Sequence, residues 1–230
     1  MNNFFTAELT AINRQEALRY LSYKDTPDEK TAALMDTCES KLLAAVKGKY
    51  TFRIYDIISN DGEAVELEGC AMKMTGKDIC AHLDGCEKAT LLCATIGSEV
   101  DTLIRREQIS DMASAVITDS LASCAVEAVC NSAEEHIRRE CPDMFMTWRF
   151  SPGYGDMPIA LQRQFLEAVN AGRFIGVFAN ENSILTPKKS VTAVIGLSSK
   201  PIEKKRRGCA VCRLYKDCEF RKRGSRCTDE

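Results

Sequence analysis

The sequence predicts an α+β fold in which a mainly antiparallel sheet is flanked by helices, followed by a Cys-rich C-terminal tail. Three observations predict it: an early pair of strand-like runs joined by turn residues, helical periodicity between the later strands, and an ordinary globular composition, 45% hydrophobic and 28% charged over 230 residues. We expect the main domain over residues 1–198, with a helical N-terminal part over about 1–48, and the tail over 199–230.

The individual elements follow from the spacing of apolar residues, which is three to four in helices and two, or continuous, in strands. The expected helices span residues 13–22, 26–46, 75–83, 99–108, 111–140 and 159–169. The expected strands span residues 50–58, 64–67, 89–96, 144–150, 174–179 and 191–197.

The second helix carries a start signal. Thr26 is the expected N-cap and Pro27 the expected first helical residue. Glu29, at the third helical position, would close a capping box with Thr26. Lys47 and Gly48 end the helix. The residues expected to face inward are Ala33, Leu34, Leu42, Leu43 and Val46.

The first strands should form a hairpin. The run 50–58 is rich in β-branched and aromatic residues, and Asn60-Asp61-Gly62 is a turn sequence before the run 64–67. The strand at 89–96 reads as buried along its length. Four cysteines in this part have no metal-ligand spacing and are expected to be small core residues: Cys70, Cys80, Cys86 and Cys93.

The long helix at 111–140 is rich in Ala, Ser and Cys, which allow close packing against it. Asp119, Ser123 and Glu127 recur every four residues and therefore share one face of this helix. Two readings of the two carboxylates stay open at this point: a role at a binding site, or an ordinary solvated or paired surface.

The most distinctive stretch runs from Arg149 to Asp156. Pro152 fixes its own φ, while Gly153 and Gly155 permit conformations closed to other residues, so we expect a tight turn. We expect Asp156 to cap the helix that follows, with Pro158 near its first turn. Free N–H groups beside the cation of Arg149 and the ring of Tyr154 would suit a ligand with a carboxylate and a flat ring. The alternative is an ordinary Pro-Gly turn.

These residues also carry a family resemblance. Arg149-x-x-x-Gly153-Tyr154 resembles the Arg-x-x-x-Gly-Tyr motif of the S-adenosylmethionine-binding activation, or reactivation, domain of cobalamin-dependent methionine synthase. Downstream, residues 175–192 are similar to the family's segment that ends in Pro-x-x-Ser-Val, here Pro187-Lys-Lys-Ser190-Val. The resemblance implies a curved antiparallel sheet flanked by helices.

The resemblance also implies roles for particular residues. The backbone of Ser151, Pro152, Gly153, Tyr154 and Gly155 would hold S-adenosylmethionine. Arg149 would pair with its carboxylate, Tyr154 would lie beside the sulfonium, and Asp119 or Glu127 would supply negative charge near the sulfur. Ser123 stands where the family has a second acid, and an N-terminal acidic residue of the family has no recognisable counterpart.

The implied function is reductive reactivation in trans. The chain would present the methyl group of S-adenosylmethionine to cob(II)alamin as that cofactor is reduced, with positioning as its catalytic contribution. The cobalamin would belong to a methionine synthase without its own activation domain, or to another corrinoid protein. A reductase, flavodoxin or ferredoxin would supply the electron. The alternative is a non-enzymatic accessory protein that binds S-adenosylmethionine or metal.

The tail differs in composition from the rest of the chain. Residues 201–230 hold ten basic and five acidic side chains. They also hold four cysteines within nineteen residues: Cys209, Cys212, Cys218 and Cys227. Four thiolates can hold zinc or an iron–sulfur cluster, and an iron–sulfur cluster is favoured because the implied reaction consumes one electron. A zinc knuckle that binds nucleic acid, or an inert tail, is the alternative.

Charge and composition exclude several broad classes. The formal charge of −2 gives no general attraction to nucleic acid or anionic membranes, so we expect neither as a partner. We expect no membrane-spanning segment and no secretory signal, and therefore a cytoplasmic protein. In that compartment the twelve cysteines indicate thiols and a metal site, not disulfides.

Overall fold

The computed structural model describes residues 4–23, 26–202 and 222. Its main sheet contains β1 (Phe5–Ala7), β2 (Gly48–Asn60), β3 (Ala64–Leu67), β4 (Met74–Thr75), β5 (Lys88–Thr95), β6 (Phe145–Met146) and β9 (Ser190–Ser198). A small second sheet pairs β7 (Phe178–Ala179) with β8 (Leu185–Thr186). The helices are α1 (Arg14–Tyr20), α2 (Glu29–Ala45), α3 (Lys77–His82), α4 (Ser98–Ser110), α5 (Met112–Glu140), the 3₁₀ turn η1 (Ile159–Leu161), α6 (Gln162–Ala168) and α7 (Ala171–Ile175).

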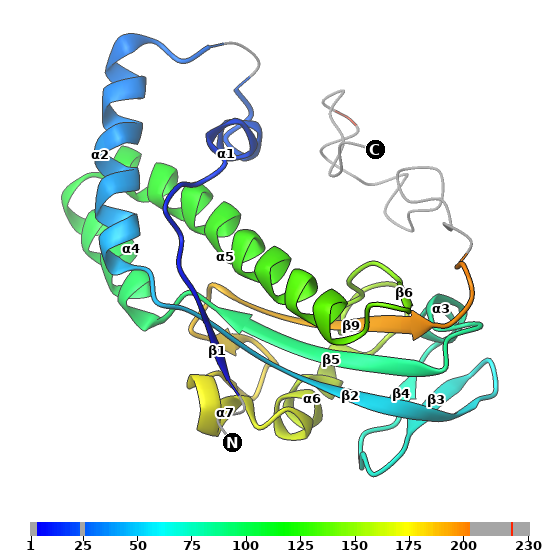
Figure 1. The fold of residues 1–230 in the computed structure, drawn as a ribbon. Helices are drawn as coiled ribbons and strands as arrows, with labels where there is room; N and C mark the ends of the chain where they lie inside the picture. The colour runs from blue at the N-terminus through cyan, green and yellow to red at the C-terminus, as the bar shows by residue number, and fades with distance from the viewer. Residues whose placement is uncertain (1–3, 24–25, 203–221, 223–230) are drawn as a thin grey trace.

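The main sheet is antiparallel at every described pairing. Its strand order is β4-β3-β2-β5-β9-β6, and β1 pairs with the start of β2. Helix α5 crosses one face of the sheet, and α6 and α7 cover the other (Figure 1). The predicted fold class, an α+β fold with a mainly antiparallel sheet flanked by helices, is therefore confirmed.

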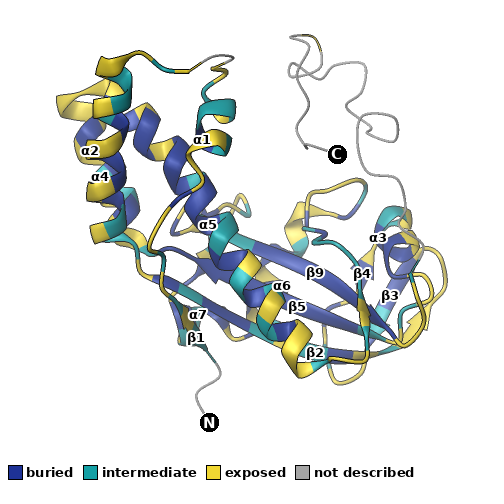
Figure 2. Cartoon of the chain, turned by 45° about the horizontal axis from the view of Figure 1, so that its top comes forward, coloured by how far each residue is buried: buried dark blue, intermediate teal, exposed yellow. Residues whose placement is uncertain are grey.

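The central strand β5 shows why both faces must be covered. Leu92 and Ala94 belong to the apolar cluster under α5, while Leu91 and Cys93 belong to the cluster under α6 and α7. All four side chains are fully buried, which explains the continuous apolar run in the sequence. Buried positions follow the sheet and the facing side of α5, and the exposed ones lie on the outer helix surfaces (Figure 2).

Helix α5 is long and apolar enough, by composition, to cross a membrane, but 67% of its most apolar window is buried inside the fold. Its small residues let α1, α2 and α4 pack against it as well as the sheet. For example, Ser120 Oγ donates to the carbonyl of Ala17 in α1 at 2.7 Å. Packing in the core is thus sufficient to explain its apolar character.

The predicted start of α2 was wrong. The helix begins at Glu29, and its cap is Asp28, whose carboxylate accepts the N–H of Thr31 at 2.8 Å; we had expected Thr26 to fill this role. Because the helical conformation starts only at Glu29, Asp28 is the residue whose side chain can reach the N–H of the third helical residue. The inward-facing residues are largely as expected: Leu42 is buried, and Leu34, Leu43 and Val46 are partly buried against the same core, whereas Ala33 is exposed. Met35, Cys38 and Glu39 are also buried and were not predicted.

The predicted strand at 144–150 is only partly regular. It pairs with β9 at Phe145–Met146 and again at a single bridge between Phe150 and Val194. Between these points Thr147 keeps only half of the ladder: its N–H donates to the carbonyl of Gly196 at 2.9 Å, but its hydroxyl, in place of its carbonyl, accepts the N–H of Gly196 at 2.7 Å. The chain nevertheless stays beside β9 and delivers Arg149 to the turn.

Two later elements also differ from the prediction. The helix expected at 159–169 is divided into η1 and α6. Phe174, expected in a strand, lies in the short helix α7, which starts after Asn170 and ends at Gly176, both in the left-handed conformation. These two residues stop the chain from running extended before Phe178.

Candidate functional site

The stretch from Ser151 to Met157 forms the tight turn that the sequence predicts. The N–H of Tyr154 donates to the carbonyl of Ser151 at 2.9 Å, and the N–H of Gly153 donates to the carbonyl of Met157 at 2.9 Å. The N–H of Met157 in turn donates to the carbonyl of Tyr154 at 3.1 Å. Three crossing hydrogen bonds within seven residues fix this backbone. They also use donors that we had expected to be free for a ligand.

Both turn glycines are required by the conformation. Gly153 has φ +93° and Gly155 has φ +53°, in the region that side chains disfavour. A Cβ at Gly155 would lie 2.1 Å from Oδ2 of Asp78, so any side chain there collides with α3. The turn is thus packed tightly against α3, which lies far earlier in the sequence.

That contact corrects the prediction for Asp156. Its carboxylate does not cap the helix that follows it; Oδ2 accepts the N–H of Lys77 at 2.9 Å and Oδ1 accepts the N–H of Asp78 at 3.0 Å, at the start of α3. Asp78 reciprocates, because its Oδ2 accepts the N–H of Asp156 at 3.1 Å. Gly76, which precedes α3, has no side chain to cap the helix, so the cap is supplied by the turn.

Asp156→Ala should lower the free energy of unfolding by about 1–2 kcal/mol, because two N–H groups of α3 lose their acceptor. Chemical denaturation measures this. Asp84→Ala, at an exposed position just after α3, is the control and should change stability by no more than about 0.5 kcal/mol. An equal loss of stability in the two variants would contradict the role of Asp156 as the cap of α3.

Arg149 extends from the turn toward α5. Its Nη2 lies 2.8 Å from Glu127 and its Nε lies 3.1 Å from Glu134, while Nη1 donates to the amide oxygen of Asn131 at 3.2 Å. A guanidinium has five N–H donors, and three of them serve these α5 side chains. The cluster of Arg149, Glu127 and Glu134 carries one more negative charge than positive.

The second motif reaches the same helix. Lys189 Nζ lies 2.9 Å from the carboxylate of Asp119 and 2.9 Å from the hydroxyl of Ser123, and the lysine side chain is only 15% exposed. Ser190 closes the segment by donating to the carbonyl of Pro187 at 2.7 Å. Lys189 is therefore held in a defined position on α5. The sequence did not predict this contact, because a pair of adjacent lysines usually lies free on the surface.

Both motifs thus meet one polar stripe of α5, which runs from Asp119 through Ser123, Glu127 and Asn131 to Glu134. The sequence analysis identified the first three and missed Asn131 and Glu134. The signal was present, because these two continue the same helical face at four and seven residues beyond Glu127.

Two tyrosines border this region. Tyr154 is 55% exposed at the turn, and its ring centroid lies 6.1 Å from that of the buried Phe150. Tyr20 of α1 was not predicted as a site residue. Burial, followed by the negative charge of Glu16 and, to a smaller degree, of Glu127, raises the pKa of Tyr20 to about 12, which keeps this phenol neutral.

The described cysteines are all free thiols. Cys80 and Cys93 are buried, as predicted, whereas Cys70 and Cys86 are only partly buried. Burial raises the pKa of Cys130 to about 12 and that of Cys124 to about 11, so these thiols are protonated and unreactive at neutral pH. Residues 4–23, 26–202 and 222 contain no group of three or more side chains that could hold a metal ion.

The four tail cysteines, Cys209, Cys212, Cys218 and Cys227, lie outside the described residues. The expected zinc or iron–sulfur site therefore stays a prediction from their number and spacing.

No protein-family model and no curated protein matches the chain. Among solved structures, the chain is similar to the MetH reactivation domain bound to AdoHcy, with a TM-score of 0.68 and 15% sequence identity, over 88% of this chain and 79% of that one. At this identity the likeness establishes the fold. That fold is the one implied by the resemblance of the two sequence motifs.

Proposed function

We propose that this chain binds S-adenosylmethionine between the 149–155 turn and the polar stripe of α5, and that it serves the reactivation of a cobalamin-dependent methyltransferase. The observation that carries the proposal is the placement of Arg149 between Glu127 and Glu134. It brings the turn motif and two carboxylates together at one partly exposed place on the fold of the reactivation domain.

The charges of this place fit the ligand. S-adenosylmethionine carries two cations, the sulfonium and the ammonium, and one carboxylate. The excess negative charge of Glu127 and Glu134 would attract the cations, and the N–H donors of Arg149 that do not serve α5 would meet the carboxylate. Asp119 is less suited to this task, because Lys189 already neutralises it.

The turn would also provide a contact surface for the uncharged parts of the ligand. The exposed ring of Tyr154 offers a surface beside a flat base or a sulfonium. Arg149 then has a second role as a positioning residue, because it holds both carboxylates where a cation would lie.

When bound, S-adenosylmethionine supplies an electrophilic methyl group that needs no proton transfer from the protein. The protein would contribute by holding the ligand in one orientation, with its methyl group directed toward the acceptor. We propose that the corrinoid belongs to a partner, either a methionine synthase without an activation domain or another corrinoid protein, and that a reductase, flavodoxin or ferredoxin reduces it. An iron–sulfur cluster or zinc at the tail cysteines remains part of this proposal.

Calorimetry with S-adenosylmethionine and S-adenosylhomocysteine tests the site. The second compound lacks the methyl group and the sulfonium charge, so the negative cluster should make wild-type protein prefer S-adenosylmethionine. Glu127→Gln should reduce that preference by about threefold to tenfold, roughly 0.7–1.4 kcal/mol, because it removes one of the attracting charges.

Glu135→Gln provides the matched control, since Glu135 is an exposed acid of the same helix and its side chain makes no contact with Arg149. It should leave the preference unchanged. Absence of binding by either compound would remove the proposed site. Equal binding of both compounds to the wild type would favour an accessory protein that does not use the sulfonium.

A further inference from the structure

The outer edge of β2 is open in its middle. On one side β2 pairs with β5 from Lys49 to Asp56. On the other side β1 covers it only at Gly48–Tyr50 and β3 only from Ile57 onward. Within the described part of the chain, no strand pairs with the outer edge over residues 51–56. This gap lies inside a sheet whose other central strands are paired on both sides.

The unpaired backbone groups can be identified from the bonds at the ends of the gap. Ile57 donates its N–H toward the β5 side, to the carbonyl of Glu87 at 2.9 Å. The carbonyl of Asp56 points the other way and accepts the N–H of Glu68 at 2.9 Å. Because residues of an antiparallel strand alternate in direction, the N–H and C=O groups of Phe52 and Ile54 face the open edge. Within residues 4–23 and 26–202, these four backbone groups have no partner and are available to an added strand.

Two hollows adjoin this edge. One, of about 670 Å³, is lined by Phe5, Tyr50 and the α5 residues His136, Arg139 and Glu140. The other, of about 460 Å³, is lined by residues 51–54 together with Glu140 of α5 and, from the opposite layer, Val169, Asn170 and Phe174. Side chains of an added strand point alternately to the two faces of the sheet, so each hollow could receive alternate residues of the same segment.

The first hollow has firm walls. The rings of Phe5 and Tyr50 stack at 5.3 Å, and those of Phe5 and His136 meet edge-on at 4.2 Å. Tyr50 Oη and His136 Nδ1 are hydrogen-bonded at 3.0 Å, and His136 Nε2 lies 3.3 Å from Glu140. Such walls do not need to be ordered when a ligand binds, which reduces the entropic cost of association.

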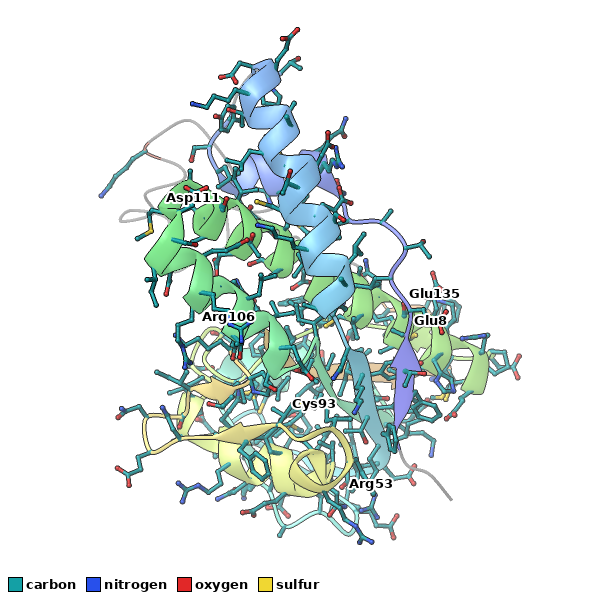
Figure 3. All side chains as sticks on the ribbon, turned by 90° about the vertical axis from the view of Figure 1, so that its left-hand side faces the viewer. Glu8, Arg53, Cys93, Arg106, Asp111 and Glu135 are labelled. Carbon is teal, nitrogen blue, oxygen red and sulfur yellow. The ribbon has the colours of Figure 1, made fainter. Side chains whose placement is uncertain are left out.

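The charge around the edge is positive. Lys49, Arg53 and Arg139 lie around it with two carboxylates, those of Glu140 and Asp56, and Asp56 is already paired with Lys88. Arg53 is exposed, and its guanidinium lies over the ring of Tyr55 at 4.9 Å. Figure 3 shows this side chain projecting outward from β2, whereas Cys93 on the next strand lies between the layers. An acidic segment would therefore complement this surface.

We propose that the open edge of β2 binds an extended segment of a partner protein as an added strand, with acidic residues beside Arg53 and apolar residues in the hollow below α5. The backbone of Phe52 and Ile54 would provide the main-chain bonds, and the two hollows would provide selectivity. A second copy of this chain fits poorly, because two-fold pairing centred on this edge brings Arg53 opposite Arg53. This proposal does not depend on S-adenosylmethionine binding.

Amide hydrogen exchange tests the edge itself. In the free full-length protein, the N–H groups of Phe52 and Ile54 should exchange at least a hundredfold faster than that of Arg53, which faces β5. Slow exchange at both positions would mean that the edge is already covered, and would overturn the proposal. A variant that lacks Asn2 and Asn3 would then show whether the covering comes from this chain.

The binding probe is an amide-capped heptapeptide of alternating valine and glutamate, titrated by NMR. It should bind and shift the amides of Phe52 and Ile54. Arg53→Glu should weaken this binding at least tenfold, and a peptide with lysine in place of glutamate should bind Arg53→Glu better than it binds wild type. The valine–glutamate peptide methylated on its valine nitrogens should lose most of its affinity, because those N–H groups are the donors to the edge.

Two results would contradict the proposal. Equal binding of the methylated and unmethylated peptides would show that no strand is added. A shift of the free protein to dimers in light scattering, abolished by Ile54→Pro, would assign the edge to a second copy. Proline is tolerated where a strand N–H faces outward, and Arg53→Glu tests the site independently should that variant fail to fold.

Discussion

Phe165→Ala is expected to lower the free energy of unfolding by about 3–5 kcal/mol, the range for a large aromatic side chain removed from a rigid core. Phe165 lies in α6, is 0% exposed, and shares its apolar cluster with Leu91 of β5 and Val194 of β9. The cavity would open directly beneath the two central strands, where neighbouring side chains have little freedom to collapse into it. Urea denaturation with linear extrapolation measures the change.

Phe178→Ala is the matched control. The same side chain is removed, but Phe178 is 60% exposed in the small β7–β8 sheet, so we expect a change of no more than about 1 kcal/mol. A comparable loss in the two variants would contradict the placement of α6 under the sheet. An unchanged denaturant slope in both would show that the variants unfold from the same compact state.

Arg149→Ala is expected to weaken S-adenosylmethionine binding at least tenfold, or about 1.4 kcal/mol. The substitution removes the donors proposed for the ligand carboxylate and leaves Glu127 and Glu134 without the cation that now holds them. Arg149→Lys keeps the charge but not the planar fork, and should recover only part of the affinity. Calorimetry provides the affinities, and thermal unfolding shows whether each variant is folded.

Two further variants sharpen this test. Gly153→Val should also lose at least tenfold in affinity, because Gly153 has φ +93° and a Cβ there would lie 3.0 Å from Ile159 Cδ1. Arg163→Ala removes an exposed arginine of α6 and should have no effect on binding. If Arg149→Ala bound the ligand as tightly as Arg163→Ala, the assignment of the site to this turn would fall.

The sequence predicted the secondary structure correctly where the local pattern and the tertiary packing favour the same conformation. The hairpin around Asn60–Gly62 and the buried strand β5 are confirmed within one or two residues, because turn chemistry and apolar runs determine them locally. The long helix expected at 111–140 is confirmed for the same reason; it begins at Met112, and Asp111 is its cap. Burial of its small residues needed no information beyond their spacing.

The errors occur where a distant residue decides the outcome. The target of Asp156 is α3, and no local pattern could distinguish this from a cap on the following helix. The hydroxyl of Thr147 interrupts the ladder beside Gly196, which depends on strand register and not on propensity. At the candidate site, Glu134 lies on the predictable face of α5, but its pairing with Arg149 depends on how the 144–150 segment crosses the helix.

The reciprocal bonds between Asp78 and Asp156 have a practical meaning for engineering. Whoever transplants the Arg-x-x-x-Gly-Tyr loop into another scaffold must carry the first turn of α3 with it, or the loop will lose its anchor. Conversely, we expect substitutions at or near Asp78 to alter ligand binding, because Asp78 holds the turn in place. Asp78 itself lies on α3, which does not contact the ligand in our proposal.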